Sequence, residues 1–301
     1  MKKISLLVVM ILFVTPVEQT RAEEIKTMVI IDDYLNIDNL LIKNKVVQEL
    51  CILETPKCKN GERFEIGIGS ANRSHNAKKI SHGTQMLQVA NKINPNINFI
   101  FISTFEINDR GEDLGIAQSS ISKALEWVYQ NKEAYNIVVV SGSFGLHELD
   151  PKAGHCVSGP ELPLAIANLK SIGVASVFSS GNDGNYKKIN FPACLPDAIA
   201  IGSTSKSNKI ELYTNYSSDV DFFVIGTHKI NNKTINGTSV STAGFSAFWA
   251  KKYTSDYNST YNKIKLLRKK TTSEKMIILN SNFKAKTIVL RTNKFVDILK
   301  K

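Results

Sequence analysis

Short apolar runs rich in Val and Ile alternate with segments of helical periodicity from about residue 28 to residue 250. The runs are continuous rather than alternating between apolar and polar positions. Such runs are typical of strands buried on both faces of a parallel sheet. Five strands are predicted in this way, at residues 28–31, 98–102, 136–140, 173–178 and 198–201.

Helical patterns separate and follow these predicted strands. They lie at residues 84–94, 116–129, 162–171, 240–253 and 258–270, with short apolar runs afterwards at 276–279 and 287–290. In the second helix, Ile121, Leu125 and Val128 fall at helical spacing. The alternation predicts an α/β fold, a doubly wound and mostly parallel sheet with helices on both faces. Residues 23–301 are expected to form one domain.

The N-terminal segment has a different pattern. Lys2 and Lys3 precede an apolar run at residues 4–14, which is too short to span a bilayer. Thr20 and Ala22 place small residues before a cleavage site near Ala22. Residues 1–22 are therefore predicted to be a secretory signal peptide, which makes the protein exported, either periplasmic or fully secreted. An uncleaved membrane anchor is the alternative.

The net charge of +11 raises the question of an acidic partner. Much of the excess lies in the C-terminal third, as at Lys263 and Lys265, and no aromatic residues are interleaved with it. A solvated basic face explains this better than nucleic-acid binding. No other apolar stretch approaches the roughly 20 residues of a membrane span, so no membrane contact is expected after signal cleavage.

Four cysteines in an exported chain are compatible with disulfides, and they allow three pairings. We expect Cys51–Cys58, which closes a short loop containing Pro56, and Cys156–Cys194. A metal site is not expected, because neither pair has the Cys-x-x-Cys spacing and no histidines cluster nearby.

Polar residues follow several of the predicted strands. Asp32 ends the first, Ser143 follows the third and Asn182 follows the fourth. The carboxyl ends of parallel strands meet at one edge of a sheet, where sites form in folds of this kind. The sequence therefore predicts that these side chains converge.

Four short motifs carry the candidate chemistry. They are Ile31-Asp32-Asp33, Ser81-His82-Gly83-Thr84, Ser180-Gly181-Asn182 and Asn236-Gly237-Thr238-Ser239. They supply an acid, a base, an amide donor and a nucleophile, with the acid, base and nucleophile in the order Asp, His, Ser, which is the order of subtilisin. From about residue 27 onward the chain resembles a subtilase, a subtilisin-like serine protease of peptidase family S8. The resemblance implies an exported endopeptidase that cleaves polypeptides through an acyl-enzyme.

The resemblance gives each motif a role. Ser239 is expected as the nucleophile at the start of a helix, and His82 as its general base. Asp32 would orient the imidazole, with Asp33 as the alternative acid. Asn182 would donate to the oxyanion together with the backbone amide of Ser239.

The substrate would lie along Ser143, Phe144 and Gly145, which resemble the Ser-Leu-Gly strand edge of a subtilase. Ser180 and Gly181 would form a wall of the substrate pocket. No organic cofactor is implied. Structural calcium is common in the family, but no Asp-x-Asp-x-Asp-Gly loop occurs here and no ligands are assigned.

The chain also departs from the family. Asp33-Tyr34 follows Asp32 where subtilases have Ser-Gly or Thr-Gly, and Thr242-Ala243 replaces Ser-Pro. About ten residues separate the predicted signal peptide from Asp32, too few for a folding propeptide. A separate inhibitor or chaperone acting in trans is one explanation. Another is a pseudoprotease that binds peptides or a partner without turnover. An esterase is not favoured, because the chain has no Gly-x-Ser-x-Gly elbow.

Overall fold

The computed structural model describes residues 24–36, 40–72, 80–107, 113–146, 156, 159–207, 209–230 and 232–266, with three short strands beyond them. The predicted signal peptide lies outside the described residues. In the described part of the chain, no helix is long and apolar enough to cross a membrane.

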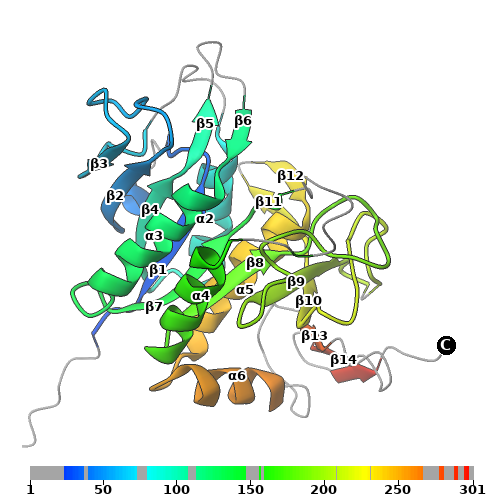
Figure 1. Ribbon diagram of the computed structural model, residues 1–301. Coiled ribbons are helices and arrows are strands. Elements are labelled where there is room, and N and C mark those ends of the chain that lie inside the picture. The colour runs from blue at the N-terminus through cyan, green and yellow to red at the C-terminus, as the bar shows by residue number, and fades with distance from the viewer. Residues whose placement is uncertain are drawn as a thin grey trace, which may run out of the picture.

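A nine-stranded sheet forms the centre of the molecule (Figure 1). Seven neighbouring strands run parallel, and one antiparallel strand closes each edge. In spatial order the strands are β13 (Ile278–Asn280), β10 (Phe222–Ile225), β9 (Ile199–Thr204), β8 (Ala175–Ser179), β7 (Ile137–Gly142), β1 (Thr27–Asp32), β4 (Asn98–Ser103), β2 (Val46–Ile52) and β3 (Phe64–Ile66).

Helices cover both faces of this sheet, as predicted. One face packs against α2 (His82–Ile93), α5 (Thr238–Lys252) and α6 (Tyr257–Leu266), and the other against α3 (Gln118–Asn131) and α4 (Glu161–Ser171). Strand β1 shows the two-sided burial directly, because Met28 and Ile30 join one core while Val29 and Ile31 join the other. The doubly wound α/β prediction is confirmed.

The remaining elements are short. They are the helix α1 (Leu40–Lys43) and the two-stranded pairs β5 (Phe105–Ile107) with β6 (Asp113–Ile116), β11 (Thr227–Ile230) with β12 (Lys233–Asn236), and β14 (Ile288–Leu290) with β15 (Phe295–Asp297).

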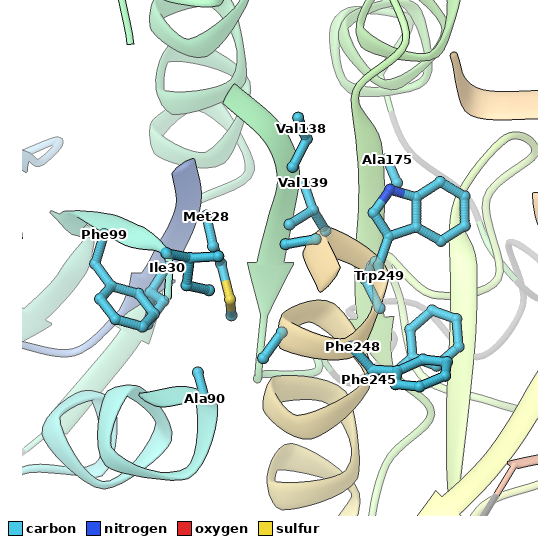
Figure 2. Close-up of a cluster of buried hydrophobic side chains, with 14 of the residues drawn as sticks. Met28, Ile30, Ala90, Phe99, Val138, Val139, Ala175, Phe245, Phe248 and Trp249 are labelled. Carbon is cyan, nitrogen blue, oxygen red and sulfur yellow. The ribbon is translucent and has the colours of Figure 1, made fainter. Parts of the chain in front are cut away.

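Helix α5 is the most deeply buried helix around the candidate site. Phe245, Phe248 and Trp249 of this helix belong to the same cluster of buried side chains as Met28 and Val139 of the sheet (Figure 2). Every residue of α5 from Thr238 to Ala250 is buried except Ser239, which is partly exposed. The hydroxyls of Ser241, Thr242 and Ser246 donate to backbone carbonyl oxygens, which allows these polar residues of the helix to be buried. The packing therefore fixes the first turn of α5, where Ser239 lies.

All four cysteines are paired in the expected way. Cys51 joins Cys58 across seven positions of sequence, and Cys156 joins Cys194 across 38. The predicted pairing is confirmed.

Candidate active site

Strand β1 and helix α2 bring an acid and a base together. His82 is the first residue of α2, and the hydroxyl of Ser81 caps that helix by accepting the backbone N–H of Thr84 at 3.0 Å. The His82 Nδ1 atom lies 2.8 Å from the Asp32 Oδ1 atom at the end of β1. The Asp32 side chain is 1% exposed and the imidazole 43% exposed. A buried carboxylate therefore orients an imidazole that a substrate can reach.

The neighbouring Asp33 serves the helix rather than the imidazole. Its Oδ2 atom accepts the backbone N–H of His82 at 3.0 Å, and its Oδ1 atom accepts those of Gly83 at 2.8 Å and Tyr34 at 2.6 Å. Asp33 thus binds two of the first backbone donors of α2, which have no partner within the helix. The imidazole contact belongs to Asp32, and the capping role of Asp33 was not anticipated from the sequence.

Burial raises the pKa of Asp33 to about 6, and the charge of Asp32 acts in the same direction. The backbone N–H of Gly83 is the first of the contacts that partly oppose this rise. The active-site end of β1 therefore carries two adjacent carboxyl groups, one of which titrates near pH 6.

Gly83 allows this close approach. A Cβ atom at Gly83 would lie 2.4 Å from Cζ of Phe101, 2.9 Å from Cβ of Asp32 and 3.0 Å from Oδ1 of Asp33. Any larger residue would push the start of α2 away from the two carboxylates.

Strand β7 and helix α5 position the candidate nucleophile. The Ser239 hydroxyl donates to the carbonyl oxygen of Ser143 at 2.9 Å, and the Ser143 hydroxyl donates to the carbonyl oxygen of Ser239 at 3.1 Å. This reciprocal pair attaches the first turn of α5 to the segment after β7. The Ser239 hydroxyl carries a single proton, so transfer to His82 requires that its bond to Ser143 be exchanged for one to the imidazole.

The acid–base pair and the serine lie on neighbouring elements. Strands β1 and β7 are adjacent and parallel, so Asp32 and Ser143 are at the same edge of the sheet. Helices α2 and α5 pack side by side through Met86, Val89, Val240 and Ala243. The parallel ends of β1 and β7 thus bring Asp32 and Ser143 to the same end of the sheet.

Asn182 faces the start of α5. Its side-chain oxygen accepts the backbone N–H of Thr238 at 2.9 Å and the Thr238 hydroxyl at 3.0 Å. Because Thr238 holds the oxygen, the NH₂ group of the same amide is the end that remains for a ligand. Asn182 is exposed, as a group that meets substrate must be.

A buried asparagine supports the loop that carries Asn182. The side-chain oxygen of Asn215 accepts the backbone N–H groups of Asp183 and Asn185, each at 2.9 Å. Its backbone N–H donates to the carbonyl oxygen of Gly181, also at 2.9 Å. Asn215 is 1% exposed and was not anticipated from the sequence, because no local motif marks it.

The two predicted substrate-binding segments lie side by side. The Ser179 hydroxyl donates to the carbonyl oxygen of Phe144 at 2.8 Å, which joins the segment after β7 to the end of β8. Phe144 is buried against Phe105 and Phe178, so its side chain supports the fold. Ser180 is buried, and Gly181 adopts a left-handed φ of +107°. Within the described residues, no group of three or more His, Cys, Asp or Glu side chains could hold a metal ion.

Comparison with known proteins shows which family the chain resembles. The family model described as the subtilase family matches residues 29–291. Subtilisin BL from Lederbergia lenta is 26% identical over 171 residues, which cover 54% of this chain and 58% of that protein. The cuticle-degrading serine protease of Arthrobotrys oligospora is 27% identical over 142 residues, 44% of this chain and 32% of that protein. The chain thus spans little more than half of the length of subtilisin BL and less of the other relative.

Solved structures show the same fold. A lanthipeptide protease superposes with a TM-score of 0.59 at 17% identity, covering 82% of this chain and 80% of that one. A cold-adapted subtilisin-like serine proteinase superposes with a TM-score of 0.57 at 19% identity, covering 89% of both chains. The family model extends over most of the sequence and over all four motifs, and the chain therefore belongs to the subtilase family.

Proposed function

We propose that this protein is an exported serine endopeptidase with Asp32, His82 and Ser239 as its catalytic triad. The contact that carries the proposal is the 2.8 Å approach of His82 Nδ1 to the buried Asp32 carboxylate. His82 begins a helix that packs against α5, where Ser239 lies in the first turn. Membership in the subtilase family supports the same roles.

In the proposed reaction, the Ser239 hydroxyl attacks the carbonyl carbon of a peptide bond while Nε2 of His82 takes its proton. Asp32 holds the imidazole in the required tautomer and stabilises the imidazolium. The Asn182 NH₂ group and the Ser239 backbone N–H donate to the oxyanion. His82 then gives the proton to the leaving amine. Water, deprotonated by His82, hydrolyses the acyl-enzyme and regenerates the Ser239 hydroxyl. The substrate would lie along residues 143–145, and all of this chemistry uses groups of the chain itself.

Export is proposed from the sequence of residues 1–22 and is supported by the two disulfides, because disulfides persist in oxidising compartments. A separate inhibitor or chaperone that acts in trans is also proposed as a partner. Parallel sheets fold slowly and gain from such assistance.

The proposed function is tested by incubating the purified protein with unfolded casein and analysing the fragments by mass spectrometry. We expect internal cleavage by the wild type and none by Ser239→Ala. Ser218→Ala is the matched control, because Ser218 is exposed and belongs to none of the four motifs. Intact casein after incubation with a folded wild-type protein would contradict the proposal and favour a pseudoprotease that binds peptides.

A further inference from the structure

Asn190 lies between the two segments assigned to substrate binding. A Cβ atom at Gly145 would be 2.8 Å from Cβ and 2.9 Å from Nδ2 of Asn190. A Cβ atom at Gly181 would be 2.6 Å from Nδ2 and 2.7 Å from Cγ of the same side chain. One asparagine side chain therefore contacts both walls and occupies the space between them.

This side chain is held in place from several directions. Its oxygen accepts from Nδ2 of Asn215 at 3.0 Å, and its own NH₂ group donates to Oδ2 of Asp183 at 3.3 Å. Its backbone N–H donates to the carbonyl oxygen of Ser180 at 2.8 Å. The next residue, Phe191, accepts the backbone N–H of Leu146 at 2.8 Å, which fixes the chain against the other wall. Asn190 is therefore a fixed part of the site rather than a side chain free to swing away.

We propose that Asn190 closes the base of the pocket for the residue that precedes the cleaved bond, and that the enzyme selects substrates with Gly, Ala or Ser at this position. The inference rests on the proposed function, because it places the substrate between residues 143–145 and residues 180–181. A side chain as large as Phe could enter only by displacing Asn190, which would break its hydrogen bonds to Asp183 and to the buried Asn215.

The size of the expected preference for Ala over Phe follows from how strongly enzyme pockets discriminate between substrate side chains. One methylene group that does not fit a pocket changes kcat/KM by about 10- to 200-fold. An aromatic ring exceeds Ala by far more than one methylene, so wild-type kcat/KM for Ala should exceed that for Phe by at least about ten-fold.

The test uses two tetrapeptide p-nitroanilides that differ only in Ala or Phe before the scissile bond. We expect the wild type to prefer Ala. Asn190→Gly removes the base of the pocket and should raise kcat/KM for the Phe substrate by at least about ten-fold relative to Ala. Asn190→Ser, which keeps a Cβ atom, should give an intermediate ratio. Asn131→Gly, the same substitution at the end of α3, is the matched control and should leave the ratio unchanged.

Labelling by a fluorophosphonate probe separates failure of this inference from failure of the proposed function. Labelling of wild type and Asn190→Gly, together with an unchanged Ala/Phe ratio, would overturn the role of Asn190 alone. Folded wild-type protein that is never labelled would overturn the proposed function, and this inference with it. If the enzyme is labelled but cleaves neither peptide, the same pocket is tested with peptide aldehydes that end in Ala or Phe. An aldehyde that binds there protects the enzyme from the fluorophosphonate. Protection by the Ala aldehyde at a lower concentration than the Phe aldehyde requires would support the inference. Equal protection by the two aldehydes would contradict it.

Discussion

The carboxyl group of Asp33 makes the stability of this protein depend on pH in a predictable way. In the folded protein burial raises its pKa to about 6, against 3.8 for a free side chain. The folded state therefore binds the Asp33 proton more tightly than the unfolded state does. Stability from this group is fully present below pH 4 and is lost as the pH rises through about 6. The loss corresponds to roughly 3 kcal/mol.

Asp33→Asn removes this titration. The new amide keeps one acceptor oxygen, but its NH₂ group must face a backbone donor of His82, or those of Gly83 and Tyr34. This mismatch should lower the unfolding free energy of the variant by about 1–3 kcal/mol, independently of pH. At pH 4 the variant should be less stable than the wild type. By pH 7.5 the difference in unfolding free energy should shift by roughly 3 kcal/mol in favour of the variant, because only the wild type then buries a second carboxylate.

Urea unfolding followed by tryptophan fluorescence measures this difference between pH 4 and pH 8. The experiment is made in a Ser239→Ala background to prevent self-digestion. Glu62→Gln serves as the control, because Glu62 is exposed on the loop between β2 and β3. A wild-type-minus-variant difference that stays constant over this range would refute the reasoning, since it would mean that Asp33 titrates equally in the folded and unfolded chains.

Two further predictions concern the oxyanion donor and the disulfides. Asn182→Ala should lower kcat by roughly 10²–10³, with little change in KM. This is the cost measured for the corresponding donor in subtilisin itself. An unchanged kcat in steady-state assays would mean that Asn182 does not act as an oxyanion donor. Replacing Cys156 and Cys194 by Ser should lower the unfolding free energy by about 4 kcal/mol, against about 2 kcal/mol for Cys51 and Cys58, because the first pair closes a longer loop. Equal losses in urea titrations would contradict the loop-length explanation.

The central sheet was predictable because its inner strands are continuous apolar runs with helices between them. Strand β2 was missed because Gln48 and Glu49 interrupt its apolar pattern, although its last four residues are buried. Strand β10, on the opposite side of the sheet, is only four residues long, too short for a periodicity to be recognised. These strands are specified by the partners that they meet in the sheet, which the local sequence does not contain.

The candidate site was likewise predictable only in part from the sequence. The proposed acid, base, amide donor and nucleophile could be selected from the sequence because each lies in a short motif at a strand or helix end. Asn190 and Asn215 could not, because they act through residues distant in the chain, Asn190 through Gly145 and Asn215 through Gly181. The role of Asp33 could not be separated from that of Asp32 until the backbone donors of α2 were located. Residues that support a site through long-range contacts leave no local pattern in the sequence.

The central claim is that Ser239 is a nucleophile activated by His82 and Asp32. Its most direct test is to treat the folded protein, in parallel with Ser239→Ala and Asp32→Asn, with a fluorophosphonate and to locate the adduct by mass spectrometry of its peptides. The account predicts one adduct per molecule, on Ser239, absent from Ser239→Ala and formed much more slowly in Asp32→Asn. An adduct on another residue, or a folded wild-type protein that stays unmodified, would contradict it.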